Sequence, residues 1–240
     1  MLGLTSSVSG SNYTEIDLKD AATDLSLWLK NDTGVAAAKW TDSSGNDNHA
    51  TQATAENQAA VSGGGLDFEA DSSDHYDLES AITIADNQGF CFAAVVTLES
   101  TSSNTLLGKD AFDQLSIRNT DSFRFRSDTN NTTTDIHFST DGSTFPGSTK
   151  MLVLLNRSAG ASNRFTFFKN GTQLTADTDT SSNEAAGENP DGFDINVLGA
   201  KEGSSQFFDG VIHELAFWSK GLNTIEIADV NSYLQEIHGL

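Results

Sequence analysis

The 240-residue sequence predicts an all-β fold, in which two antiparallel sheets form a sandwich or a barrel and one helix closes the chain. Short segments of alternating apolar and polar residues recur along the chain, as expected of strands with one buried face. Clusters of Gly, Asn, Asp and Ser separate these segments at short intervals. Only the end of the chain has the spacing of an amphipathic helix.

The first segment, residues 1–22, is polar and aperiodic, and we expect it to be an arm that anchors the protein or takes part in its assembly. We expect the rest of the chain, residues 23–240, to form a single domain. From Asp24 the pattern is that of a strand, because three leucines alternate with Ser26, Trp28 and Lys30. Further strands are expected over Ala36–Thr41, Asn48–Ala53, Leu66–Glu69, Tyr76–Glu79, Phe90–Leu98, Gln114–Arg118, Phe123–Ser127, Ile136–Ser139, Met151–Arg157, Arg164–Lys169, Thr172–Ala176, Asp194–Leu198 and Val211–Ser219.

Two of these segments, Phe90–Val96 and Met151–Leu155, are apolar throughout. Such runs are typical of central strands that are buried on both faces. Cys91 lies in the first run, so we expect it to be a small core residue. It is also the only cysteine, which excludes a disulfide within one chain.

Asn170-Gly171 is the clearest hairpin signal, because this pair favours the positive φ values of a type I′ turn. The closing helix is expected over residues 223–238. Asn223 and Glu226 form the pattern of a capping box, and Gly239 is placed to end the helix. The stripe that would pack against the sandwich consists of Ile227, Val230, Leu234 and Ile237.

The composition excludes several classes of function. The chain has 34 acidic and 13 basic side chains and a formal charge of −21. Binding nucleic acid requires clustered Lys and Arg, and so does binding an anionic membrane surface, so we expect neither partner. The apolar runs are too short to cross a bilayer, and we expect no signal peptide in the first residues. A hydrophobic content of 37 % is enough for a folded core.

Four segments, taken in order, resemble the laminin-G-like, concanavalin A-like jelly-roll family. They are Leu25–Lys30 with the Trp-x-Asp-x-Ser-Gly-Asn turn of Lys39–Gln52, then Gly63–Leu78, the hairpin Phe165–Leu174, and Phe208–Trp218 with the helix that follows. No single motif is specific, and the order and spacing carry the resemblance, which implies a jelly-roll sandwich. One turn departs from the family's pattern, because Phe68 is followed by Glu-Ala-Asp rather than by Asp-Gly.

A narrower resemblance concerns the opening Met1-Leu-Gly-Leu-Thr-Ser-Ser-Val-Ser together with Leu25–Lys30 and the turn Ser44–Gln52. These segments resemble virion structural proteins of tailed marine phages, cyanophages especially. The resemblance implies a capsid decoration, fibre or tail appendage that is made in the host cytoplasm and located in the virion. Its partners would be other virion proteins and sister subunits.

Calcium is the ligand that this sandwich family most readily suggests, because jelly-roll relatives often bind it in rim loops. Calcium takes six to eight oxygen ligands from carboxylates, amide side chains and carbonyls. Suitable residues are Asp42, Asn46 and Asp47 in the first turn, and Asp71 and Asp74 in the second. The alternative is that these residues only shape their turns, because Asp and Asn bond their own backbone readily.

Catalysis has little support. Glycosidases of this sandwich typically carry Glu-x-Asp-x-x-Glu on one strand, which presents two carboxylates to the cleft. The nearest match, Glu15-Ile-Asp-Leu-Lys-Asp20, ends in Asp and precedes the expected core. The five histidines lack the His-x-x-x-His spacing of a metal site. We therefore expect no enzyme and no catalytic residue.

Carbohydrate binding usually pairs an exposed aromatic ring with polar groups. Trp28, Trp40 and Trp218 are chemically suitable, but each falls inside a strand pattern and is expected in the core. Arg118, Arg124 and Arg126 lie close together, the last two on one strand face opposite Phe123 and Phe125. This could be a contact patch for an acidic neighbour, although an ordinary solvated face is the simpler interpretation.

The sequence thus predicts a non-enzymatic virion component that displays a lectin-like domain for attachment to a host surface or glycan. The alternative is a soluble carbohydrate-binding module outside any virion, and the third is a glycoside hydrolase of the same fold.

Overall fold

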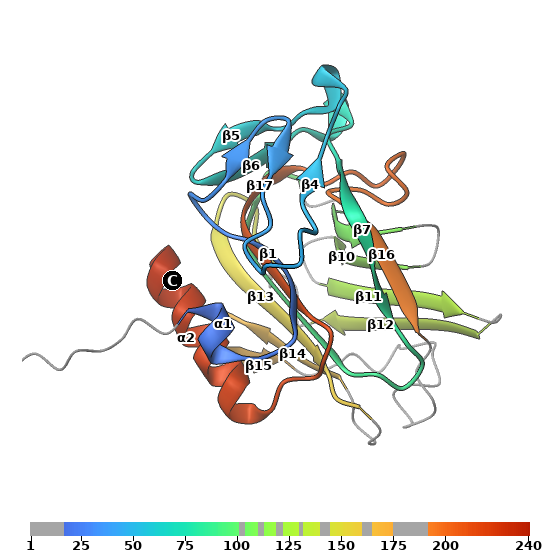
Figure 1. Ribbon diagram of the computed structural model, residues 1–240, viewed down its shortest axis with the longest axis vertical. Helices are drawn as coiled ribbons and strands as arrows, with labels where there is room; N and C mark the ends of the chain where they lie inside the picture. Colours follow the sequence, from blue (N-terminus) through green and yellow to red (C-terminus); the bar gives the residue numbers. More distant parts are fainter. Residues whose placement is uncertain are drawn as a thin grey trace, which may run out of the picture.

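The computed structural model describes residues 17–100, 104–109, 113–118, 122–129, 132–139, 145–159, 165–174 and 192–240. Two antiparallel sheets face one another, and two helices lie together on one side of the molecule (Figure 1). The all-β sandwich with one C-terminal helix that the sequence predicts is confirmed, and its architecture is that of a concanavalin A-like jelly roll.

The eight-stranded sheet, here sheet A, carries the helices. In spatial order its strands are β15 (Thr172–Leu174), β14 (Phe165–Lys169), β13 (Lys150–Arg157), β8 (Phe90–Leu98), β17 (Gly210–Trp218), β6 (Gly65–Phe68) and β5 (Ala60–Ser62). The eighth strand, β1 (Leu25–Leu29), also pairs with β17.

The nine-stranded sheet, here sheet B, faces it. Its order is β12 (Thr132–Ser139), β11 (Ser122–Thr129), β10 (Gln114–Arg118), β9 (Asn104–Gly108), β16 (Phe193–Leu198), β7 (Tyr76–Ile84), β4 (Ala50–Thr51), β3 (Lys39–Trp40) and β2 (Val35–Ala36). Two 3₁₀ turns, η1 (Ala55–Asn57) and η2 (Ala70–Ser72), lie in the connections.

The main core lies between the sheets and is rich in phenylalanine. In β8, Phe90, Phe92 and Val96 point into it, and the phenyl ring of Phe90 stacks on that of Phe217 at 5.6 Å. The next residues along the strand point the other way, as the two-residue repeat of a strand requires. Both faces of β8 and β13 are buried, which confirms the prediction for the two apolar runs.

A second core explains why those outer faces are apolar. α1 (Leu18–Ala21) and α2 (Thr224–His238) cover the outer face of sheet A. The side chains of Cys91, Leu152 and Trp218 from the sheet meet those of Leu18 and Leu234 from the two helices. We call α1, α2 and the second core the helix layer.

The local signals at the two ends of α2 are confirmed. Asn223 caps the helix and forms the capping box with Glu226, and Gly239 ends it with a φ of 66°. One prediction for its stripe is wrong, because Ile237 is 43 % exposed while the other three members are buried. Ile237 points away from the sheet, whereas His238 in the same turn is buried against Glu214 of β17.

The Asn170-Gly171 hairpin is confirmed. The two residues have φ values of 45° and 74° and join β14 to β15 with Lys169 opposite Thr172. The expected strand Ala36–Thr41 is wrong, because β2 and β3 form a tight hairpin through Ala37 and Ala38, a turn without Gly or Asn. Strands β5 and β9 lie outside the predicted strands, although Leu106 and Leu107 of β9 belong to the main core.

The expected arm ends earlier than residue 22. Residues 1–16 lie outside the described residues, but Leu18, Ala21 and Ala22 are buried in the second core. The side chain of Asp17 caps α1 by accepting the backbone N–H groups of Lys19 and Asp20. The packed domain therefore includes residues 17–22.

Candidate functional site

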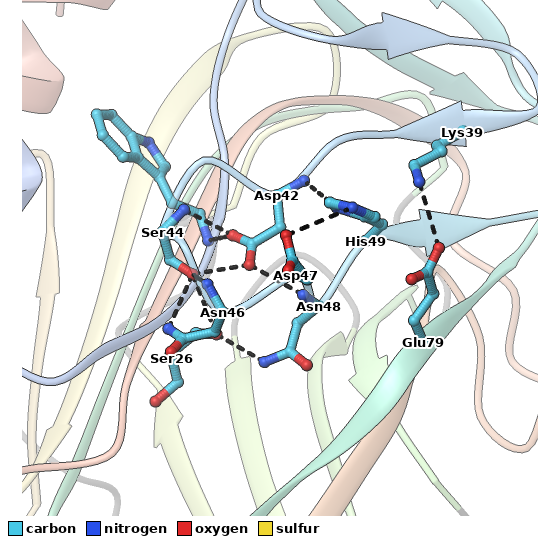
Figure 2. A network of polar contacts seen from close by, with 10 residues as sticks. Ser26, Lys39, Asp42, Ser44, Asn46, Asp47, Asn48, His49 and Glu79 are labelled. Atoms are coloured by element: carbon cyan, nitrogen blue, oxygen red, sulfur yellow. Dashed lines mark hydrogen bonds and ion pairs between the residues drawn. The ribbon is translucent and has the colours of Figure 1, made fainter.

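The first predicted calcium turn is built around the carboxylate of Asp42, which is 7 % exposed. Oδ1 accepts the backbone N–H groups of Trp28 and Ser44, each at 2.8 Å. Oδ2 accepts the hydroxyl of Ser44 at 2.7 Å and the N–H of Asn48 at 3.0 Å (Figure 2). Four donors from the chain thus surround both oxygens, and they tie the turn to β1.

The two other predicted residues of this turn behave differently. Asn46 joins the network, because its side-chain amide donates to the Leu25 carbonyl at 2.7 Å and to Ser44 Oγ at 3.0 Å. The side chain of Asp47 is 86 % exposed and lies 3.8 Å from His49 Nε2. The structure therefore brings Asp42 and Asn46 together, but not Asp47.

The second predicted turn separates its two residues. Asp71 is exposed in η2, whereas Asp74 is 3 % exposed and accepts the Glu69 N–H at 2.9 Å. Burial raises the pKa of Asp74. In the part of the chain that the structure describes, no three His, Cys, Asp or Glu side chains form a group that could hold a metal ion. Calcium binding at either turn stays a prediction.

The three tryptophans are core residues, as predicted. Trp28 is 2 % exposed, and Trp40 and Trp218 are fully buried. The indole N–H of Trp28 donates to Glu214, and that of Trp40 to the Lys30 carbonyl. None of the three can act as an exposed platform for a sugar ring.

The outer face of sheet B is polar, in contrast to that of sheet A. The register places Ser116 between Thr105 on β9 and Arg124 on β11, and Gln114 beside Arg126. Asn196 lies at the bulge of β16. We call this set the polar face: Thr105, Gln114, Ser116, Arg124, Arg126 and Asn196.

The shared face of Arg124 and Arg126 is confirmed, because Phe123 and Phe125 are buried on the core side of the same strand. The simpler interpretation of this face as solvated is wrong for Arg124, which is only 8 % exposed. Ser116 is 1 % exposed and Thr105 is fully buried. Sequence reasoning located the arginines but missed the hydroxyl groups, which the register alone brings beside them.

Three oxygens of the polar face have no hydrogen-bond partner among the described residues, namely Thr105 Oγ1, Ser116 Oγ and Asn196 Oδ1. An unsatisfied buried polar group costs about 1–3 kcal/mol, and native structures hold few of them. Their concentration on neighbouring strands therefore calls for a physical explanation.

An ion pair lies on the same outer surface. Lys109 Nζ is 2.6 Å from Asp194 Oδ2, and this hydrogen bond holds the pKa of Asp194 below its usual value. The segment that resembles a glycosidase motif lies elsewhere. Its Glu15 is outside the described residues, Asp17 caps α1, and Asp20 is exposed. Among the described residues, no helix has the length and apolar composition that a membrane crossing requires.

Comparison with known proteins places this geometry in a family. The laminin G model of the concanavalin A-like lectin/glucanases superfamily matches residues 70–228. A search of curated protein sequences finds no match to the chain.

Solved structures share the fold at low sequence identity. The binding domain of Paraclostridial Mosquitocidal Protein 1 has a TM-score of 0.63 at 16 % identity, over 90 % of this chain and 53 % of that one. A Trypanosoma rangeli sialidase has a TM-score of 0.57 at 17 % identity, and 90 % of this chain covers 33 % of that enzyme.

Domain 4 of AbnA, an arabinanase of Geobacillus stearothermophilus solved in complex with arabinotriose, has a TM-score of 0.51 at 17 % identity, over 88 % and 98 % of the two chains. Our chain thus spans a third of the sialidase and nearly all of the AbnA domain. The fold is lectin-like, and the chain belongs to the concanavalin A-like lectin/glucanases superfamily.

Proposed function

We propose that this chain is a non-enzymatic, lectin-like domain that binds a glycan through the polar face of sheet B. The observation that carries the proposal is the set of oxygens without a partner on Thr105, Ser116 and Asn196, which lie on three neighbouring strands next to the strand of Arg124. These oxygens are buried, so a saccharide reaches them only when the residues that cover them move aside. Hydroxyl, amide and guanidinium groups provide both donors and acceptors, which matches the many hydroxyl groups of a saccharide.

Two further findings support a binding role over a catalytic one. Retaining and inverting glycosidases need two carboxyl groups that flank the scissile bond. On the outer surface of sheet B, the Asp194 carboxylate is paired with Lys109 and is therefore not free to act as a general acid or base. The fold is also shared with the AbnA domain that was solved with arabinotriose.

The test removes the unpartnered hydroxyl groups one at a time. Ser116→Ala and Thr105→Val delete an oxygen without taking a partner from any chain atom, so stability is expected to stay equal or to rise. Binding to an array printed with arabinotriose, sialyllactose and bacterial surface polysaccharides is expected to fall about 5–10-fold for each variant. Ser232→Ala on the exposed side of α2 is the matched control.

Unchanged binding by both variants would contradict the assignment of the site. No binding of the native chain to any printed glycan would contradict the function itself. Because both variants remove unsatisfied groups, a loss of binding with a native melting temperature cannot be attributed to unfolding.

We further propose that the domain is displayed on a phage virion, where the glycan would belong to the host surface. The resemblance of Met1–Ser9 and the turn Ser44–Gln52 to virion proteins of tailed marine phages supports this setting. Mass spectrometry of purified particles is expected to detect the chain. Deletion of residues 1–16, which leaves Leu18 and the second core intact, is expected to abolish incorporation into particles. Undiminished incorporation would contradict the anchoring role.

A further inference from the structure

The connection between β16 and β17 folds back over the outer side of sheet B. Gly108 on β9 points to that side, because it lies opposite Gln114 of the polar face. A methyl group at Gly108 would come within 2.8 Å of the Ala200 carbonyl oxygen and 3.3 Å of Lys201 Cα, so the connection passes directly over this point of the strand. We call residues 200–207 the covering loop, and it leaves the sandwich on the side of sheet B (Figure 1).

The covering loop explains why side chains on an outer sheet face are buried. Thr105 lies beside Gly108, with its Cγ2 atom 3.5 Å from the same methyl position, and it is fully buried. Val197 forms a cross-strand pair with the exposed Asp77, so it also points outward. It is nevertheless only 4 % exposed and belongs to neither core. This part of the outer face is therefore closed by the chain itself.

The contacts that hold the covering loop on the sheet lie outside both cores. The Thr105 N–H donates to the Gln206 carbonyl at 3.3 Å, which is longer than an ordinary backbone hydrogen bond. The ring of His75, just before β7, lies against Gly203 and has its centroid 6.0 Å from that of Phe207. Phe207 is part of neither core. These contacts can therefore be released while the sandwich stays packed.

The closed position of the loop has an energetic cost. The φ angles of Glu202 and Gln206 are 61° and 50°, in the left-handed region that residues other than glycine rarely adopt. Such conformations persist only where the surrounding contacts maintain them. Beneath the loop, Thr105 Oγ1 is buried without a partner among the described residues. Opening relieves both costs, because the backbone can relax and water can bond the hydroxyl group.

We infer that the covering loop is a lid that opens to expose the polar face around Thr105, and that the contact between His75 and Phe207 is its latch. The inference rests on the proposed glycan-binding function, and it supplies the way in which a saccharide reaches buried oxygens. The saccharide binds the open form, so the apparent affinity rises with the fraction of chains whose lid is open.

Thiol labelling measures opening of the lid without any glycan. Thr105→Cys places a thiol under the lid, and Val197→Cys is a second probe in case the first disturbs folding. Cys91 of the same chain is fully buried in the second core, and burial raises the pKa of its thiol, so its reaction with iodoacetamide reports global unfolding. Peptide mass spectrometry gives the rate at each cysteine, normalised to the rate in the unfolded chain. The probe under the lid is expected to react at least about 10-fold faster than Cys91.

Release of the latch is expected to act on the lid alone. In the Thr105→Cys chain, His75→Ala is expected to accelerate labelling of the probe about 5–10-fold and to leave the rate at Cys91 unchanged. Ser204→Ala, at an exposed position of the same loop, is the matched control and should change neither rate. With Thr105 intact, His75→Ala is expected to increase capture of arabinotriose, sialyllactose or bacterial polysaccharides by a similar factor.

Equal normalised rates at the probe and at Cys91 would overturn the inference, because the loop would then open only with the whole domain. Equal acceleration of both cysteines by His75→Ala would overturn it for the same reason. Accelerated labelling with unchanged capture of a bound glycan would show that the saccharide does not enter beneath the loop, and it would overturn the role of the lid. Accelerated labelling without binding of any glycan would instead overturn the proposed function and leave the lid in place.

Discussion

Glu214 Oε2 and His238 Nε2 lie 2.8 Å apart, although their side chains are only 1 % and 2 % exposed. A bulge in β17 between Ile212 and Glu214 turns the carboxylate toward α2 instead of the main core. Its second oxygen accepts the indole N–H of Trp28 at 2.7 Å. This buried network ties β1, β17 and the last turn of α2 together.

Removing one partner of this pair is expected to destabilise the domain strongly. His238→Ala leaves a buried carboxylate with one donor fewer, which is expected to lower the free energy of unfolding by about 3 kcal/mol in urea denaturation. Glu236→Ala, on the exposed side of the same helix, is the control and should change it by less than about 0.5 kcal/mol. Equal effects of the two variants would contradict a role for the pair.

His213 makes the stability of the domain depend on acid pH. Its ring is 6 % exposed, and burial lowers its pKa to about 4, with Lys150 and His238 contributing in the same direction. Between pH 6.5 and 4 the unfolded chain takes up a proton that the folded chain does not, so stability falls as the pH falls through this range. The loss is expected to approach about 3 kcal/mol.

Urea denaturation at intervals from pH 7.5 to pH 4 measures this loss. His213→Gln should flatten the curve, whereas Ser232→Ala on the exposed side of α2 should leave its slope unchanged. A native slope in His213→Gln would show that another group controls the acid sensitivity.

Asp42 is expected to stabilise the first turn without calcium. Asp42→Ala removes the acceptor of four donors and is expected to lower the free energy of unfolding by about 2–4 kcal/mol. Asp47→Ala, whose side chain is 86 % exposed, should have little effect. Both measurements are made in EDTA and in millimolar calcium. A loss on Asp42→Ala that appears only in calcium would favour a metal ligand over a turn residue.

Asp67 is expected to oppose folding at neutral pH. Its Oδ1 is buried without a partner, and burial raises its pKa, helped by the nearby charge of Asp209. The folded chain binds the proton more tightly than the unfolded chain, so the penalty is present at neutral pH and disappears as the pH falls.

Asp67→Asn should therefore raise the free energy of unfolding at pH 7 by up to about 1 kcal/mol, with a smaller gain in acid. The exposed Asp71→Asn is the control. A gain that is independent of pH would contradict an electrostatic cause.

Predictions that depend on neighbours in the sequence were accurate. The Asn170-Gly171 turn and the capping box of Asn223 need only the residues beside them, and the structure confirms both. The expected strand Ala36–Thr41 failed for the opposite reason. Its two-residue turn contains alanines, so only the pairing of β2 with β3 reveals the hairpin.

The calcium turns show a different limit. Composition identified Asp42, Asn46 and Asp47 as oxygen ligands, but it could not tell that the Asp42 carboxylate accepts N–H groups from Trp28 and Asn48. Trp28 is 14 residues away along the chain. Whether a carboxylate binds an ion or its own backbone depends on contacts that spacing does not encode.

The sequence by itself determined the class of fold, the two strands buried on both faces and the ends of the closing helix, because periodicity and local hydrogen bonding control these features. Only the tertiary structure decided where the polar face lies. Thr105, Ser116 and Arg124 come from three strands, and antiparallel register brings them into one row. Their unpartnered oxygens follow from that packing, since no local pattern distinguishes a buried serine from an exposed one.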